Sequence, residues 1–289
     1  MTVPIGDPDP IGQLVELSRT LGRPERDLVV LAEGNTSVRT TGNRMLVKAS
    51  GSVMAAAGPG DFVEVDTNPL LELVGSTATD DALVTTVMLE ARRDSDGPRP
   101  SMEALVHAIC LRQPGVEVVA HTHPVAVNAI LCSDQAHALV DGALFPDQIV
   151  VLGRHAVLVP YADPGLSLAR SVGAAIDAHV AEYDRPPKLV YLANHGIFVL
   201  AGSPREALAV TEMTVKTARV LSGVLAVGRP RYLSDAEADR IDTRPDEAHR
   251  RTRLAEATAS EHRRPARAEE RSERGADQIG TGGGGRADS

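Results

Sequence analysis

Short strand-like runs and helical patterns alternate irregularly between about residues 10 and 230 of the chain. A strict strand–helix–strand rhythm would predict a doubly wound parallel sheet, because parallel neighbours need long crossover connections. Here several strand-like runs are joined by short links, which antiparallel neighbours allow. The pattern therefore favours an α/β fold in which helices cover a mixed sheet.

The spacing of apolar residues and the residues that cap helices predict the individual helices and strands. Residues 203–227 form the longest helical pattern, with Ser203 as its cap and Pro204 in its first turn. The other helical patterns span 11–22, 80–93 and 101–113. The strand-like runs are a hairpin over 37–51 that turns at 41–43, and then 115–123, 147–153, 155–161 and 188–202.

The end of the chain has a different composition. Residues 231–250 are rich in charge and predict a helical extension on the surface. Residues 251–289 mix both charges, contain almost no large apolar side chain and include a run of four glycines. Such a segment cannot offset the conformational entropy that it would lose on ordering, so we expect a disordered tail.

Composition argues against two classes of function. The formal net charge is −9, and the chain has no Trp, 3 Phe and 4 Tyr. A negative surface repels phosphate backbones, and few aromatic rings leave little to stack on bases, so we expect no nucleic-acid partner. The first residues lack the basic and apolar regions of a signal peptide, and no apolar run reaches the ~18 residues of a membrane span. We expect a cytoplasmic protein without a membrane partner.

Two histidines, His121 and His123, stand one residue apart at the end of an apolar run. Side chains alternate between the faces of a strand, so both imidazoles point to the same side. Such a pair suits a zinc ion, but by itself it is weak evidence, and two hydrogen-bonded histidines at a strand end explain the spacing better.

A third histidine, His195, interrupts the run 188–202 within Asn194-His195-Gly196. A simple turn between two strands accounts for this break. A catalytic zinc commonly has three protein ligands and one open position, and His121, His123 and His195 would complete such a set.

Glu103 stands near the start of the helical pattern that opens with Ser101. Ser101 can cap this helix, and a carboxylate in the first turn suits the helix dipole. If the helix end faces a metal, Glu103 is instead a candidate general base, and His107 lies four residues on along the same helix face.

Two glycine turns complete the set of polar segments. The pairs Gly34-Asn35 and Ser50-Gly51 could present backbone N–H groups and a hydroxyl to a phosphate. Each pair is also an ordinary turn dipeptide, so neither alone distinguishes a phosphate site from a turn.

Taken together, five segments resemble the class II aldolase/adducin family, whose members include zinc-dependent fuculose-phosphate and rhamnulose-phosphate aldolases. The resemblance covers about residues 10 to 225 and implies a three-layer α/β/α fold over residues 1–230 as the catalytic domain. The segments are GNTSVR, KASG, PSMEALVH, AHTHP and NHG, in the order of the family.

The resemblance implies a role for each matching residue. His121, His123 and His195 would bind one Zn²⁺ per subunit, and Glu103 would be the acid/base carboxylate. The family's substrate-phosphate cradle corresponds to Gly34, Asn35, Ser50, Gly51 and Ser101. The implied reaction is the cleavage of a ketose 1-phosphate to dihydroxyacetone phosphate and an aldehyde through a zinc-stabilised enediolate, in a homotetramer that binds small sugar phosphates.

The chain departs from the family pattern at two points. Fuculose-type members carry a second serine where this chain has Met102. They also carry a tyrosine proton donor after the histidine pair, whereas residues 132–148 here contain no tyrosine. Tyr161 and Asp147 are the substitutes that we consider.

Three other readings remain open. The same family contains sugar-phosphate 4-epimerases and a dehydratase, which would use the same metal. An adducin-like scaffold would have lost the metal ligands, whereas this chain has them all. A Schiff-base aldolase would use Lys48, but three clustered histidines have no role in that mechanism.

Overall fold

The computed structural model describes residues 9–244 of the 289-residue chain. In these residues seven strands form one sheet in the order β3-β2-β1-β4-β7-β6-β5. Every pair of neighbours is antiparallel except β5 and β6. The mixed, largely antiparallel sheet is thereby confirmed. The strands are β1 (Asn35–Arg39), β2 (Arg44–Lys48), β3 (Phe62–Asp66), β4 (Val118–Thr122), β5 (Val157–Val159), β6 (Leu189–Leu192) and β7 (Gly196–Ala201).

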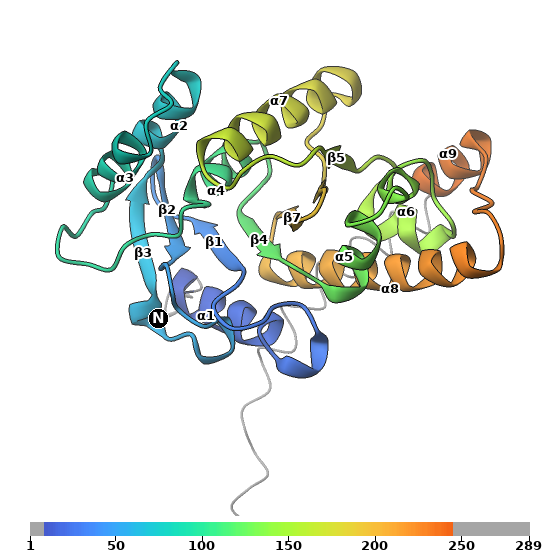
Figure 1. The fold of residues 1–289 in the computed structure, drawn as a ribbon, viewed down its shortest axis with the longest axis horizontal. Helices are drawn as coiled ribbons and strands as arrows, with labels where there is room; N and C mark the ends of the chain where they lie inside the picture. Colours follow the sequence, from blue (N-terminus) through green and yellow to red (C-terminus); the bar gives the residue numbers. More distant parts are fainter. Residues whose placement is uncertain (1–8, 245–289) are drawn as a thin grey trace, which may run out of the picture. The chain divides into compact units, whose positions relative to one another are not determined.

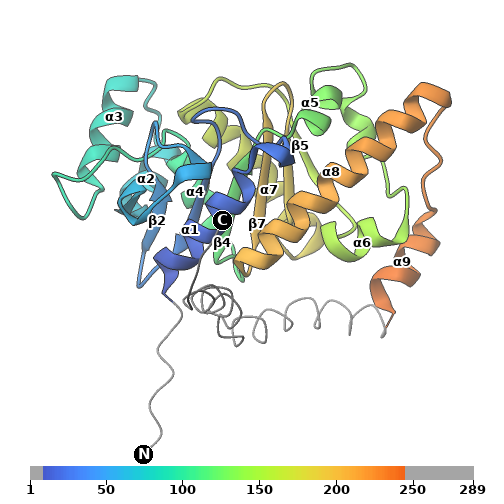
Figure 2. The same ribbon diagram turned by 90° about the horizontal axis from the view of Figure 1, so that it is seen from below.

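Helices cover both faces of this sheet. Helices α2, α3, α4 and α7 share one apolar core with it, and α1, α5 and α8 share the core on the opposite face (Figure 1). Figure 2 shows α1 and α8 in front of the strands. The three-layer α/β/α fold is thus confirmed. The α-helices are α1 (Pro10–Leu21), α2 (Thr67–Gly75), α3 (Asp81–Glu90), α4 (Ala104–Leu111), α5 (Val125–Leu131), α6 (Pro146–Leu152), α7 (Leu166–Tyr183), α8 (Pro204–Val227) and α9 (Asp235–Thr243), with short 3-10 helices at Pro24–Arg26, Met54–Ala56, Pro59–Asp61 and Ala136–Leu139.

Local signals explain several element boundaries. The Ser203 side chain accepts a hydrogen bond from the Glu206 N–H, and α8 begins at Pro204, as the sequence predicts. Helix α1 ends at Leu21, just before Gly22. The β1–β2 hairpin turns over residues 41–43, where Gly42 has a φ of +67°.

The prediction of a strand over 147–153 was wrong, because α6 occupies this stretch. Pro146 supplies the helix start, and Gly153, with a φ of +81°, ends it. Ile149 and Leu152 are three residues apart and both buried, so these apolar residues lie on one buried face of a helix. The sequence prediction also contained no element at β3, α2 or α7.

Helix α9 follows the main body of the fold and packs against α6. Ala238 of α9 lies in a small apolar cluster with Ala143 and Ile149. Ion pairs from Arg154 to Asp235 and Asp239 accompany this contact. The tail predicted over 251–289 lies outside the described residues, and the domain boundaries at 230 and 250 stay predictions.

Candidate metal centre

Four elements meet where the candidate residues lie. In the sheet, Asn35 at the start of β1 pairs with His121 near the end of β4, which in turn pairs with Phe198 of β7. His123 follows β4 directly, and His195 lies in the turn before β7. Glu103 precedes the first residue of α4. The topology therefore joins positions that are far apart in the sequence.

The ligand atoms of Glu103, His121, His123 and His195 all lie within 4.8 Å of one another. We call these four residues the histidine cluster. Glu103 Oε1 is 3.1 Å from His121 Nε2 and 3.2 Å from His195 Nε2. The Nε2 atoms of His121 and His123 are 2.9 Å apart. Three imidazole nitrogens and one carboxylate oxygen thus point at a common centre.

The protonation of His121 tests whether a metal ion fits this centre. Its Nδ1 is 2.9 Å from the carbonyl oxygen of Ile197, which can only accept a hydrogen bond. Nδ1 therefore carries a proton, and in the neutral ring Nε2 turns its lone pair toward the carboxylate of Glu103. In that form the two acceptors repel each other unless a cation lies between them, which is either a second ring proton or a metal ion. The three imidazole nitrogens and the carboxylate oxygen thus form a possible metal site, and zinc is an ion that binds such ligands.

The electrostatics of the cluster favour forms that can bind a metal. Burial and the neighbouring His121 and His195 lower the pKa of His123 to about 3, so its imidazole is neutral at pH 7. Burial alone would raise the pKa of Glu103. His121, His195 and Asn35 outweigh burial and hold that pKa well below its usual range. A neutral imidazole and an ionised carboxylate are the forms that coordinate metals.

The turn between β6 and β7 places His195. Asn194 adopts a left-handed conformation with a φ of 57°, which asparagine tolerates. The Asn128 side chain donates to the His195 carbonyl oxygen at 2.9 Å, which ties this turn to α5. A Cβ on Gly196 would lie 2.5 Å from the Thr122 carbonyl oxygen, so only glycine lets the turn approach β4 this closely.

The position of Glu103 differs from the one expected in the sequence. Helix α4 begins at Ala104, so Glu103 is its cap residue and not part of the first turn. The Ser101 hydroxyl accepts from the Glu103 N–H at 3.4 Å, a long contact. The Glu103 side chain turns to the histidines and does not cap the helix. The position of the Glu103 carboxylate therefore suits a role at the candidate metal site better than stabilisation of the helix dipole.

The glycine turns lie beside the cluster. The Lys48 carbonyl oxygen accepts from the Ser101 N–H at 3.1 Å, and the Arg99 carbonyl accepts from the Ser50 N–H at 2.8 Å. Gly51, with a φ of +80°, faces open space next to them. The Asn35 side chain donates to Ser101 Oγ at 3.1 Å, which connects this turn to the cluster.

Gly34 has a packing role of its own. It has a φ of +69°, and a Cβ there would lie 2.7 Å from a methyl of Val29 and 2.8 Å from the His121 carbonyl oxygen. Only glycine fits this backbone. The phosphate-binding role of the five cradle residues stays a prediction.

The two substitute proton donors and Met102 lie in other surroundings. Tyr161 is exposed and donates to Asp163 at 3.0 Å, and Asp147 pairs with Lys216 at 3.8 Å. Met102 packs partly buried against the apolar core of α4, in agreement with the loss of a hydroxyl there.

Lys48 is 2% exposed and donates to the carbonyl oxygens of Ala49 and Ser52. Burial lowers the pKa of its ammonium group, against the opposing effect of Asp61 and Glu103. An amine held beneath a turn in this way is poorly placed to attack a carbonyl, so the geometry disfavours the Schiff-base reading.

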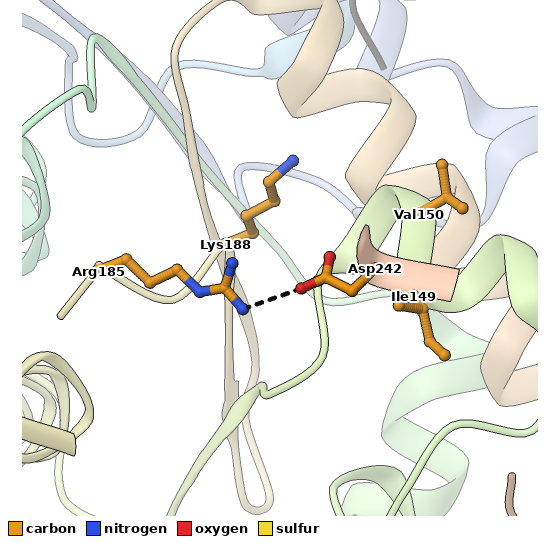
Figure 3. Close-up of a pocket in the computed structure, with 6 residues that line it drawn as sticks. Ile149, Val150, Arg185, Lys188 and Asp242 are labelled. Atoms are coloured by element: carbon orange, nitrogen blue, oxygen red, sulfur yellow. Dashed lines mark hydrogen bonds and ion pairs between the residues drawn. The ribbon is translucent and has the colours of Figure 1, made fainter. Parts of the chain in front are cut away.

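A hollow of about 220 Å³ lies away from the histidine cluster, at α6 and α9 (Figure 3). Its cations already have carboxylate partners. Arg185 pairs with Asp242 at 3.4 Å, and Lys188 pairs with Glu206 at 2.7 Å. The hollow contains no member of the cluster, so the cluster is the better candidate for the functional centre.

Several residues around the cluster were not identified from the sequence as part of a site. Asn128 holds the His195 turn, and the Phe198 ring stacks on His121 with centroids 4.2 Å apart. His107 and Ser37 form hydrogen bonds behind Asn35. The four-residue spacing from Glu103 to His107 was the one available signal.

Comparison with known proteins agrees with this architecture. Residues 12–222 match the family model described as Class II Aldolase and Adducin N-terminal domain. The chain is 26% identical over 232 residues to the 3-oxo-tetronate 4-phosphate decarboxylase of Haemophilus influenzae, covering 79% of this chain and 96% of that protein. It is 28% identical over 200 residues to the uncharacterized oxidoreductase YuxG of Bacillus subtilis, covering 66% of this chain but spanning only 26% of that relative's length.

Among solved structures, an N-terminal class II aldolase domain of a conserved protein from Thermoplasma acidophilum superposes with a TM-score of 0.59. The two sequences are 25% identical, and the match covers 77% of this chain and 97% of the other. In residues 9–244, no helix has the length and hydropathy that crossing a membrane requires.

Proposed function

The chain belongs to the class II aldolase and adducin N-terminal domain family, and we propose that it is a metal-dependent lyase that acts on a small sugar phosphate and breaks the bond between the α and β carbons of its carbonyl group. The observation that carries this proposal is the convergence of Glu103, His121, His123 and His195 within 4.8 Å. Three imidazoles with one carboxylate suit a Lewis-acid centre better than a structural one.

The three histidines would hold the metal, with zinc as the ion that the resemblance implies. A bound divalent cation supplies stabilisation of the negative charge that develops on the substrate's carbonyl oxygen. Glu103 would move the proton at the reacting carbon, because its Oε1 reaches the centre of the cluster while Asn35 holds its Oε2 at 2.6 Å. The cradle of Gly34, Asn35, Ser50, Gly51 and Ser101 would bind the phosphate. The homotetramer remains part of the proposal and rests on the resemblance.

Our first candidate reaction is the cleavage of a ketose 1-phosphate of the fuculose or rhamnulose type. Breaking the bond between C3 and C4 leaves the enediolate of dihydroxyacetone phosphate and an aldehyde. This reaction needs a group that takes the proton from the C4 hydroxyl as it becomes the aldehyde. The segment 132–148 contains no tyrosine for that task.

The second candidate is the decarboxylation of a 3-oxo acid phosphate. Two observations favour it. One is the similarity to the decarboxylase, which extends over 96% of that protein. The other is chemical: carbon dioxide leaves a carboxylate without a hydroxyl proton being removed, so the missing tyrosine is no obstacle. Loss of carbon dioxide from a 3-oxo-tetronate 4-phosphate leaves the same enediolate, which protonation converts to dihydroxyacetone phosphate.

A coupled assay for dihydroxyacetone phosphate tests both candidates at once. The zinc-loaded protein is given a panel of ketose 1-phosphates and, separately, 3-oxo-tetronate 4-phosphate. We expect release from one substrate class, abolished by EDTA and restored by Zn²⁺. The co-product, an aldehyde or carbon dioxide, identifies the reaction. If the metal-loaded protein releases nothing from either class, the lyase proposal is wrong, and the family's epimerases or dehydratase become the better assignment.

A further inference from the structure

Behind the histidine cluster lies a second buried histidine arrangement. His107 of α4 is 0% exposed, and its ring meets the Phe198 ring edge-on with centroids 5.4 Å apart. Burying an imidazole in such surroundings destabilises the fold unless both ring nitrogens have hydrogen-bond partners. Both do: Nδ1 is 2.6 Å from Ser37 Oγ, and Nε2 contacts Asn35 Oδ1.

These two partners determine where the proton of the imidazole lies. The amide oxygen of Asn35 can only accept, so Nε2 of His107 carries the proton. Nδ1 then accepts from the Ser37 hydroxyl. Burial lowers the pKa of His107 to about 3, so the ring stays neutral. Asn35 and Ser37 are two apart on β1 and therefore present their side chains to the same face.

The Asn35 amide is held from both sides. The Glu103 carboxylate can only accept, so Nδ2 donates to its Oε2 at 2.6 Å and Oδ1 is directed at His107. Rotating the amide by half a turn would place Oδ1 against the carboxylate, which is repulsive. The hydrogen bond from His107 Nε2 to Oδ1 therefore anchors the orientation that holds Glu103.

We propose that His107 is a positioning residue for the reaction, acting through Asn35 to hold the Glu103 carboxylate with one oxygen anchored and the other directed at the cluster centre. The proposal rests on the proposed function for its kinetic consequence. The site would then include not only Asn35 on β1 but also His107 on the buried face of α4. Both ring nitrogens of His107 have their hydrogen-bond partners outside the histidine cluster, at Ser37 and Asn35.

The test compares three variants with the wild type. His107→Leu removes both hydrogen bonds and keeps the site apolar, and His107→Gln retains an N–H and an oxygen acceptor. His179→Leu is the matched control, since His179 is also buried, with its nitrogens 3.0 Å and 3.3 Å from backbone carbonyl oxygens away from the cluster. Each variant is assayed on the substrate that releases dihydroxyacetone phosphate, and its metal content is measured.

We expect His107→Leu to lower kcat about 10–100-fold with a smaller change in KM, the range found when a supporting partner of a site is removed. Its metal content should equal that of the wild type, because all three histidine ligands remain. His107→Gln should recover most of the lost kcat, and His179→Leu should keep the wild-type value. A His107→Leu variant with the kcat of His179→Leu would overturn the proposal.

Two measurements do not depend on activity. Selective ¹⁵N-histidine NMR of the wild type should show His107 protonated at Nε2 and not at Nδ1, and the opposite tautomer would contradict the proposal even if His107→Leu fails to fold. A crystal structure of His107→Leu should show the Asn35–Glu103 hydrogen bond broken, whereas an unchanged bond would refute the positioning role. A wild type without lyase activity refutes the proposed function and leaves these two results interpretable.

Discussion

Replacing His121 with alanine should leave the purified protein without its metal and without lyase activity. His121 is fully buried, and its Nε2 lies within contact distance of both Glu103 and His123. Losing a supporting partner of a metal ligand already costs 10–100-fold in affinity or activity, so loss of the ligand itself should weaken metal binding at least ~100-fold. Metal content per chain, measured by inductively coupled plasma mass spectrometry after dialysis, checks this.

The matched control is His137→Ala. His137 is an exposed histidine in the short helix Ala136–Leu139, outside the histidine cluster. This variant should retain both metal and activity. A His121→Ala protein that carries as much metal as His137→Ala would show that the metal, if one binds, is held elsewhere.

Replacing Glu103 with glutamine should lower kcat by about 10²–10⁴, the usual contribution of a positioned acid or base. Glutamine keeps the size of the side chain and can still accept from Asn35 through its amide oxygen. It cannot carry a proton at the reacting carbon. The metal should remain, because the three imidazoles are unchanged. Steady-state kinetics with parallel metal analysis separates loss of chemistry from loss of metal.

Two other glutamates supply the controls. Glu117 pairs with Arg39 at 3.2 Å, outside the histidine cluster, so Glu117→Gln should have wild-type kinetics. Glu33 is the informative rival, since its carboxylate lies 3.7 Å from His123 Nδ1. If Glu103→Gln keeps the kcat of Glu117→Gln while Glu33→Gln loses it, Glu103 is not the acid/base residue and our assignment is wrong.

The fold could be predicted where local signals agree with tertiary packing. The cap at Ser203 and the glycine turn at Gly42 correctly marked α8 and the first hairpin. Residues 147–153 show the limit of this reasoning. A run of Ile, Val, Val and Leu suits a buried strand, but packing against α8 and α9 turns the same residues into α6. Periodicity alone does not distinguish a short buried helix from a strand.

The grouping of the candidate metal ligands was partly predictable from the sequence. Strand alternation brings His121 and His123 to one side, and their spacing is visible in the sequence. Asn35 could be assigned only a turn or a phosphate-binding role, because its contacts with Glu103 and His107 span 68 and 72 residues. Packing of α4 against β1 creates these contacts, and no local pattern in the sequence indicates this packing.

The most direct test of the metal centre is anomalous diffraction from crystals of the zinc-loaded protein, with data collected on both sides of the zinc absorption edge. Our account predicts one anomalous peak per chain, about 2.0–2.1 Å from the Nε2 atoms of His121, His123 and His195. A peak at another site, or no peak in protein that releases dihydroxyacetone phosphate, would contradict it.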